Sequence, residues 1–464
     1  MAGGDGDVGY PDEPRRGRHL VFGIVALALV LASIDQTIVA TALGSIQTEL
    51  HAQLNWSTWT ITIYALGQVV VMPLAGRLSD MYGRKTVFLS AAALFSVASL
   101  ACGLADDIYV LVALRALQAV GGGAFIPSAT GIVSEQFGRD RDRAVGMFTS
   151  IFPIGGIVGP TLGGVFVTYA SWRWIFFVNL PIGLTLVALG LRFIPASRGR
   201  QGSRIDGVGI ALFGSCILAA MFGISFLGSG GVTARDPGFL LPELAAFAAL
   251  VLFVRHARAD PAPFIPLLFL SGRGFAAMNF INLLFGGVVI GLGALVPIYA
   301  EDRFGISSLD AGTVLSARAV GMIVVAGLAV LVLRRTGHRT PMFIGFTIVA
   351  IGMALICLTP GHVSHYAWLA TAAGITGIGM GMSLPASNNA TLHLARDEIA
   401  AVAGLRGMFR QSGAILAVAI STAVAARSPD AGLVLGHVFL VFSALLLVVV
   451  LPVVLVIPEH RGSW

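Results

Sequence analysis

Residues 76–85 read Gly76-Arg-Leu-Ser-Asp80-Met-Tyr-Gly83-Arg-Lys85, and a long apolar stretch lies on each side of them. So dense a cluster of charge and glycine on a connection between two helices is costly to hold at a membrane surface. The stretch also contains Lys85, the one lysine of the chain. It therefore predicts two membrane-spanning helices joined by a specialised charged turn, and an ordinary positive cytosolic turn is the alternative.

The whole chain is strongly apolar. Of its 464 residues 56% are hydrophobic and 11% are charged, whereas a soluble domain has about a quarter charged residues. No long polar segment interrupts this pattern, so we expect no sizeable soluble domain. The basic excess is arginine, placed singly or in threes between apolar runs, which favours membrane orientation over nucleic-acid binding. Cys102, Cys216 and Cys357 lie in apolar stretches and are expected to be buried rather than to bind a metal.

The apolar segments are long enough to cross a bilayer, which takes about 20 residues of helix. They must be helices, because lipid cannot satisfy unpaired backbone groups. Fourteen spans are predicted, near 20–44, 57–77, 86–105, 108–134, 144–169, 172–194, 206–228, 238–255, 274–300, 310–333, 341–360, 366–394, 399–426 and 432–457.

Arginine positions predict the orientation of these spans. If the N-terminus is cytosolic, most arginines fall in inner segments, and the outer segments hold only Arg173, Arg235, Arg303 and Arg427. Cytosolic connections carry such an excess of positive charge. We therefore predict a multi-pass protein of the plasma (inner) membrane with both termini in the cytosol.

The spans suggest two halves. The predicted class is an all-α integral membrane protein with two six-helix bundles and two extra helices, and internal repeats of this kind are a known transporter architecture. The predicted units are a tail at 1–19, a bundle at 20–194, a linker with two extra helices at 195–272, a bundle at 273–457 and a tail at 458–464.

Several motifs carry a family resemblance. The turn matches G-x-L-x-D-x-x-G-R-K at Gly76, Leu78, Asp80, Gly83, Arg84 and Lys85, and so resembles the connection between spans two and three of major facilitator transporters. The fifth span matches G-x-x-x-G-P-x-x-G-G, the motif of exporters in this family, at Gly155, Gly159, Pro160, Gly163 and Gly164. The segment from Trp172 to Gly183, which contains Asn179, also matches, with a mainly structural meaning. With fourteen spans, the chain resembles the branch of drug:proton antiporters.

Asp35 and Arg115 are the predicted proton-coupling residues. Asp35 lies within the first span, where a carboxylate is costly and usually marks an ion or substrate path. Arg115 lies in the fourth span, in a stretch that resembles the family motif R-x-x-Q-G-x-G, whose arginine is thought to assist proton transfer. Asp35 is its obvious partner. A buried structural carboxylate, or a fixed structural ion pair, is the alternative.

The turn at 76–85 is predicted to be a cytosolic gate. Asp80 can sit at a helix N-terminus, where the helix dipole favours anions, and the family precedent is the start of the span near Ile399. Arg84 and Lys85 can pair with Asp80, with Glu135 or with lipid phosphate. These contacts would form when the cytosolic side is closed.

Other polar groups fall inside the predicted spans. Arg318, Arg406 and Arg410 suit either an anionic part of a substrate or local structural pairing, and Glu301 is either a second protonatable site or a surface charge. The predicted cavity residues could equally be helix–helix hydrogen bonds; they are Tyr64, Gln68, Asn279, Asn282, Asn388 and Arg410.

Three functions remain open. A phosphate-binding loop needs glycine before its lysine, and Lys85 follows Arg84, so an ion gradient is the expected energy source. The first function is proton-coupled export of small amphipathic organic compounds by alternating access. The others are export of a lipid-like product and a non-transporting membrane sensor or scaffold. We predict no enzyme, no cofactor, no metal and no nucleic-acid partner, with protons and membrane lipid as further partners. The oligomeric state stays open.

Overall fold

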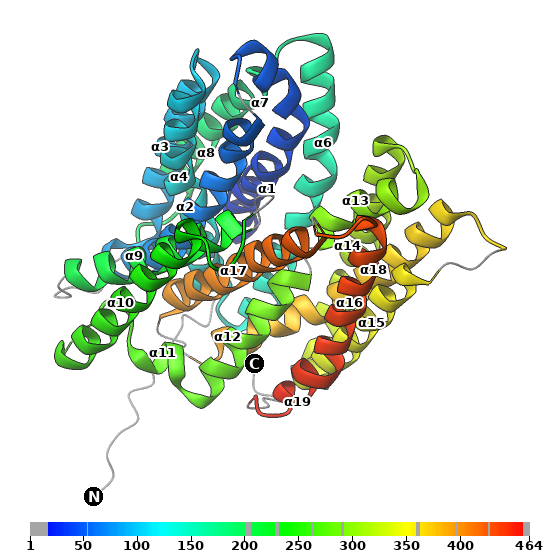
Figure 1. Ribbon diagram of the computed structural model, residues 1–464. Helices are drawn as coiled ribbons and strands as arrows, with labels where there is room; N and C mark the ends of the chain where they lie inside the picture. The colour runs from blue at the N-terminus through cyan, green and yellow to red at the C-terminus, as the bar shows by residue number, and fades with distance from the viewer. Residues whose placement is uncertain are drawn as a thin grey trace, which may run out of the picture.

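The computed structural model in Figure 1 describes residues 17–52, 54–197, 199, 206–227, 232–261, 263–288, 292–358, 362–394, 398–425 and 427–457. Most of the two predicted tails, residues 1–16 and 458–464, lies outside the described residues, as do residues 200–205 of the predicted linker.

The first part of the described chain folds into long apolar helices, because only internal hydrogen bonding satisfies the backbone of such segments in lipid. A short 3₁₀ turn at Gly138–Asp140 links the fourth helix to the fifth. The helices are α1 Arg18–Glu49, α2 Leu54–Tyr82, α3 Arg84–Gly103, α4 Ile108–Phe137, α5 Arg141–Thr149, α6 Phe152–Tyr169, α7 Trp174–Phe177 and α8 Asn179–Phe193.

The remaining helices follow the same pattern. A π-helical turn at Leu446–Val450 lies inside the last span. The helices are α9 Gly207–Leu227, α10 Pro237–Ala259, α11 Leu267–Ser271, α12 Arg273–Gly286, α13 Leu292–Phe304, α14 Ser308–Thr336, α15 Arg339–Cys357, α16 His365–Leu392, α17 Ile399–Ala425, α18 Ala431–Leu445 and α19 Leu451–Val454.

The predicted class, an all-α membrane protein, is confirmed. Among the described residues, 13 helical segments are long and apolar enough to cross a membrane. Within the predicted span at 274–300 the structure describes α12 and α13, and residues 289–291 between them lie outside the described residues. Counting α12 and α13 together as one span gives the predicted total of fourteen.

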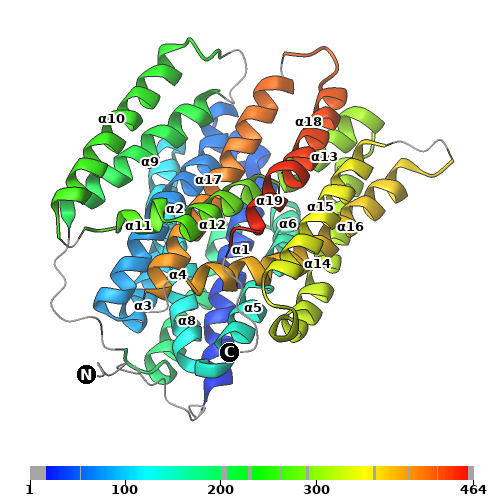
Figure 2. The ribbon, with the colours of Figure 1, turned by 90° about the horizontal axis from the view of Figure 1, so that it is seen from below.

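Helix α17 lies in the middle of the molecule. We call α1–α8 the first part of the chain and α12–α19 the last part. In Figures 1 and 2, α17 runs between the helices of the first part and the other helices of the last part. It packs against α2, α4 and α9 on one side and against α12 on the other. Helices α9 and α10 pack on each other as a hairpin, and α16 packs on α14 and α15.

The buried apolar side chains form separate clusters. One comprises residues between Ala277 and Ile457. Another runs from Val21 to Met408 and so joins the first helices, the α9–α10 hairpin and the beginning of α17. The domain boundaries inferred from the sequence stay predictions, since α17 shares its packing with both parts.

The helices have two common ends. At one end, Asp80 meets the beginning of α17 through the backbone of Ala401, and Asp142 of α5 meets the end of α16 through His393; we call it the Asp80 end. At the other end, Arg173 joins Glu49 and Asp106, and we call it the Glu49 end.

Candidate functional site

Asp35 and Arg115 are in direct contact. Asp35 lies in the middle of α1 with no exposed surface, and Arg115 of α4 is 1% exposed. Nη1 of Arg115 donates to Oδ2 of Asp35 at 2.9 Å, which makes a fully buried ion pair. The two residues that the sequence assigned to proton coupling are therefore brought together from helices far apart in the chain.

Two buried amides complete the surroundings of Asp35. Nε2 of Gln118 and Nδ2 of Asn179 donate to its Oδ1 at 2.9 and 3.1 Å. Gln118 also accepts a hydrogen bond from Arg115 at 2.6 Å and donates to Oγ of Ser99 at 2.7 Å. Donors from α4 and α8 thus converge on both carboxylate oxygens, which offsets the cost of burying the charge.

Sequence analysis missed Gln118 and Asn179 as partners of Asp35. A signal existed for Gln118, because residues three apart lie on one helix face and Arg115 is three residues earlier. Asn179 had no such signal. It starts α8, and only the folded chain brings it to α1.

The guanidinium of Arg115 is held on every side. Its Nε donates to the carbonyl of Thr60 at 3.0 Å, and its Cζ lies 4.0 Å from the centre of the Tyr64 ring. The predicted cavity residue Tyr64 is therefore a buried neighbour of the ion pair. Gln68, one turn further along α2, accepts a hydrogen bond from Nε2 of Gln36 at 2.6 Å.

A glycine face of α6 packs against the helix that carries Asp35. A Cβ added at any of three glycines would collide with a side chain of α1, so the two helices approach closely. These glycines are Gly155, Gly159 and Gly163, and the side chains that they meet are Ser33, Thr37 and Thr41. Oγ1 of Thr37 also donates to the carbonyl of Gly155 at 3.1 Å. We call this contact the glycine seam.

The other two residues of the same motif do not belong to the glycine seam. A Cβ at Gly164 would meet no atom within 4 Å, and Pro160 is exposed within α6. The motif thus combines a packing face with residues on other faces of the helix.

Asp80 joins three elements. Its Oδ2 accepts a hydrogen bond from the backbone N–H of Ala401 at 2.9 Å, in the first turn of α17. Its Oδ1 lies 3.5 Å from Nη2 of Arg84. Arg84 in turn pairs with Glu135 at 3.0 Å and donates to the carbonyl of Gly131 at 2.8 Å. The predicted gate residues Asp80 and Arg84 thus link α2, α3, α4 and α17.

Glycines let α2 and α17 touch backbone to backbone beside Asp80. A Cβ at Gly76 would collide with the carbonyl of Ala400, and a Cβ at Gly404 would collide with the carbonyl of Met72. No larger residue fits at either position without separating the helices.

Further polar contacts join the two parts of the chain at the Asp80 end. Arg77 pairs with Glu398 at 3.0 Å. Nδ2 of Asn389 donates to the carbonyl of Asp142 at 2.9 Å, and Nε2 of His393 lies 2.9 Å from the Asp142 carboxylate. These contacts therefore hold the first and last parts together at the Asp80 end.

The remaining predicted gate residues contact the end of α8 and the segment after it. Gly83 has a φ of 94°, which favours glycine, and a Cβ there would collide with the carbonyl of Ser197. Nζ of Lys85 donates to the carbonyl of Leu191 at 2.9 Å. These residues hold the turn against α8 rather than against α17.

At the Glu49 end the ion pairs between described residues stay within each part. Arg173 contacts Glu49 and Asp106, which all precede residue 194. Arg303 pairs with Asp430 at 3.3 Å, and both follow residue 273.

Three predicted cavity residues are buried asparagines. Asn279 donates to the carbonyl of Phe269 at 2.8 Å, and Asn282 donates to the carbonyl of Met278 at 2.7 Å, so both serve local packing. Asn388 of α16 is 1% exposed, and neither its Oδ1 nor its Nδ2 has a hydrogen-bond partner among the described residues.

The predicted cavity residue Arg410 lies on α17. Its Cζ is 6.0 Å from the centre of the Phe152 ring on α6, so it extends from the last part of the chain toward the first. Arg406, one turn earlier, is 3% exposed, and its Nη1 has no partner among the described residues.

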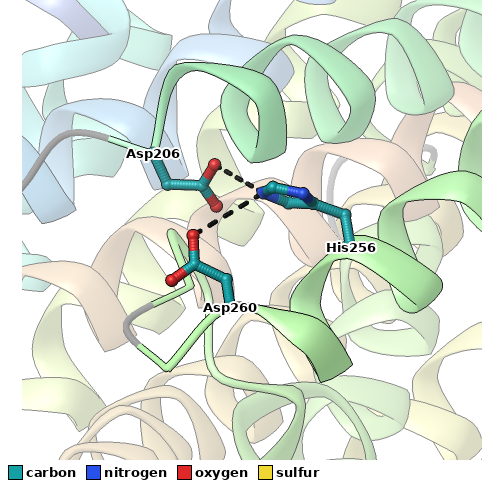
Figure 3. Close-up of side chains that lie close together, drawn as sticks. All are labelled: Asp206, His256 and Asp260. Atoms are coloured by element: carbon teal, nitrogen blue, oxygen red, sulfur yellow. Dashed lines mark hydrogen bonds and ion pairs between the residues drawn. The ribbon is translucent and has the colours of Figure 1, made fainter.

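A cluster outside these sites lies at the base of the α9–α10 hairpin (Figure 3). Nε2 of His256 lies 2.7 Å from Asp206 and 3.8 Å from Asp260. The three side chains could hold a metal ion by spacing, a grouping that sequence analysis did not foresee.

The oxygens of Asp206 are already used within the protein. They accept hydrogen bonds from the N–H groups of Gly209 at 2.7 Å and Phe264 at 3.0 Å. Burial raises the pKa of Asp206, but these donors and His256 outweigh it and hold that pKa below its usual value. The cluster thus fastens the start of α9 to the segment before α11.

Comparisons with known proteins agree with this architecture. A sequence model of the Major Facilitator Superfamily matches residues 25–418 and 278–463. Multidrug resistance protein 3 of Bacillus subtilis (strain 168) is 30% identical over 381 residues, which cover 80% of this chain and 72% of that protein. The Multidrug resistance protein B homolog of Mycobacterium tuberculosis (strain ATCC 25618 / H37Rv) is 28% identical over 419 residues, covering 89% of this chain and 77% of that protein.

Solved structures share the fold. The human organic anion transporter MFSD10 (TETRAN) matches 93% of this chain and 100% of its own chain, with a TM-score of 0.67 at 13% identity. At so low an identity this match supports the fold alone. The match to the family model and the two relatives establish that this chain belongs to the Major Facilitator Superfamily of membrane transporters.

Proposed function

We propose that this protein is a proton-coupled antiporter that exports amphipathic organic compounds by alternating access. The observation that carries the proposal is the buried contact between Asp35 and Arg115, because ionisable groups inside a membrane usually mark an ion path. The names of the two multidrug resistance relatives support this class of compound.

The proposed orientation puts the Asp80 end and both termini in the cytosol of a cell bounded by the plasma membrane. The inner connections then carry most of the arginines. In this orientation the contacts of Asp80 with α17 and of Arg77 with Glu398 close the cytosolic side. The conformation described here is then the one that faces outward.

Protonation of Asp35 is the proposed switch. A proton removes the carboxylate charge, so Arg115 loses its ionic partner. The hydrogen bonds that Gln118 and Asn179 donate to Asp35 must then rearrange. The glycine seam joins α1 to α6, and any shift of α1 is therefore passed to α6. In the proposed cycle Asp35 takes a proton from outside as the compound leaves, and gives it to the cytosol before the next compound binds.

Proteoliposomes test this proposal directly. The experiment measures proton movement with an enclosed pH dye while ethidium, N-phenyl-1-naphthylamine or 1-anilinonaphthalene-8-sulfonate is added. Asp35→Asn keeps the size of the side chain and removes the exchangeable charge, so coupled proton movement should be lost. Asp302→Asn changes an exposed carboxylate of α13 and is the matched control.

Coupled transport that survives in Asp35→Asn would remove Asp35 from the mechanism. Flipping of a labelled lipid, without movement of any of the three compounds, would favour lipid export instead. Neither activity would favour the sensor or scaffold.

A further inference from the structure

The last part of the chain carries buried positive charge without acidic residues nearby in sequence. From residue 311 to 396 and from 399 to 429 there is no aspartate or glutamate. Arg406 and Arg410 lie on α17 inside the second of these ranges. The nearest acid before them is Glu398, which is paired with Arg77 at 3.0 Å.

Among the described residues, neither arginine has a carboxylate partner. Arg406 is 3% exposed and its Nη1 has no hydrogen-bond partner within the described ranges. The described contact of the Arg410 guanidinium is with the Phe152 ring, at 6.0 Å. A guanidinium keeps its charge and offers five N–H donors. Arg406 and Arg410 are four residues apart and so place two such groups on one face of α17.

The two arginines lie where the two parts of the molecule meet. Phe152 belongs to α6, and its carbonyl accepts a hydrogen bond from Ser33, two residues before Asp35. Beside them, Met72 of α2 borders α17 at Gly407. The surroundings thus combine apolar side chains with unpaired positive charge.

The order of the two arginines along α17 places them at different depths between the two ends of the molecule. Helix α17 starts at the fastened Asp80 end, so Arg406 lies deeper and Arg410 about 6 Å nearer to the Glu49 end. Arg410 is only half-buried. A compound that enters from the Glu49 end would therefore meet Arg410 before Arg406.

We propose that Arg406 and Arg410 bind the anionic group of the transported compound. This inference rests on the proposed export function and narrows its substrate class to amphipathic compounds with a carboxylate, sulfonate or phosphate group. Guanidinium groups suit these anions, because their planar N–H donors match two oxygens at once. A lipid headgroup offers the same chemistry as a soluble anion, so both sources must be tested.

Binding to the protein in nanodiscs of zwitterionic lipid tests the site. The probes are 1-anilinonaphthalene-8-sulfonate and N-phenyl-1-naphthylamine, which share an apolar body and differ by the sulfonate. Equilibrium dialysis against empty discs gives the binding that is due to the protein. Arg406→Gln and Arg410→Gln should each weaken binding of the sulfonate by about tenfold or more, the usual effect of losing a charged hydrogen bond.

Controls separate charge from fold. Binding of the neutral probe should change less than about twofold in the same variants, because it makes no use of the arginines. Arg410→Lys keeps the charge and should retain most of the affinity for the sulfonate. Arg192→Gln removes an exposed arginine of α8 and should leave both affinities unchanged. Melting temperatures identify any variant that fails to fold.

A second arm identifies a lipid source. Discs that contain phosphatidylglycerol are analysed by native mass spectrometry, with the wild type and the Arg406→Gln/Arg410→Gln double variant. Phosphatidylglycerol retained by the wild type and lost by the double variant would make a lipid headgroup the bound anion. If neither the sulfonate nor phosphatidylglycerol depends on the arginines, the inference is overturned.

The binding and transport experiments together distinguish a failure of the anion site from a failure of the proposed function. Arginine-dependent binding without coupled proton movement would keep the anion site and reject the antiport. Coupled movement of ethidium or N-phenyl-1-naphthylamine, with binding of the sulfonate and phosphatidylglycerol unchanged by the arginine variants, would keep the antiport and reject the anion site.

Discussion

The two parts of the molecule treat buried charge in opposite ways. In the first part, Asp35 and Arg115 neutralise each other, and amides supply the remaining hydrogen bonds. In the last part, Arg406 has an Nη1 without a partner in the described structure, and the contact described for Arg410 is an aromatic ring. The first site has its counter-charge in place, whereas within the described ranges the second shows no negative charge paired with its arginines.

This difference suggests that the two sites have different roles. A compensated pair is stable by itself and changes only when a proton arrives. Uncompensated guanidinium groups are costly until an anion binds them, so they suit substrate recognition. Four substitutions test this contrast through stability.

Removal of Arg115 should have the largest effect. Arg115→Gln leaves the Asp35 carboxylate buried without its ionic partner, which costs about 3–5 kcal/mol in comparable buried pairs. We expect a large fall in melting temperature, measured by intrinsic fluorescence in detergent.

The double variant Arg115→Gln/Asp35→Asn is the control for this prediction. It removes both charges, and much of the lost stability should return. A double variant no more stable than Arg115→Gln would mean that the pair is not the compensated unit described here.

The glycine seam should give the next largest effect. At Gly159→Ala the new methyl group collides with Thr37, and overpacking of this kind costs about 1–3 kcal/mol. Gly164→Ala belongs to the same motif but meets open space, so it should leave the melting temperature unchanged. Equal effects of the two variants would contradict the assignment of the seam to one face of α6.

The sequence predicted the fold and part of the site, for different reasons. The number of spans followed from the length of the apolar segments, because a bilayer of fixed thickness sets that length. Asp35 and Arg115 were found because charge in lipid is rare.

The missed site residues are those whose meaning depends on packing. Asn179 acts on Asp35 from another helix, and no spacing along the chain reveals such a contact. The contact of Tyr64 with the guanidinium of Arg115 was not predicted, and its place in a substrate cavity stays a prediction. The cluster of Asp206, His256 and Asp260 was also missed, because its members are separated by the whole α9–α10 hairpin.

The substitution Asp206→Asn tests a paired charge outside the membrane-spanning helices. Asp206→Asn weakens its hydrogen bonds to the backbone of Gly209 and Phe264, so a loss of about 1 kcal/mol is expected at neutral pH. The pKa of Asp206 is lowered from 3.8 in the folded protein. Its contribution to stability is therefore complete well above pH 3.8 and disappears as the pH falls through the folded pKa.

The measurement is the difference in melting temperature between wild type and Asp206→Asn from pH 7 downward. The difference should shrink below pH 3.8. A difference that stays constant as the pH falls further below 3.8 would show that the carboxylate charge contributes nothing to the contact between the start of α9 and the segment before α11.

Arg410→Gln should have the smallest effect and the opposite sign. It removes one of two like charges four residues apart, and relief of such repulsion is worth about 0.2–0.5 kcal/mol. Without an added anion, the melting temperature of the variant should equal or slightly exceed that of the wild type. Addition of 1-anilinonaphthalene-8-sulfonate should then stabilise the wild type more than the variant, because a ligand stabilises the form that binds it. A variant that melts well below the wild type in both conditions would mean that Arg410 already has a structural partner, and the contrast between the two parts would be lost.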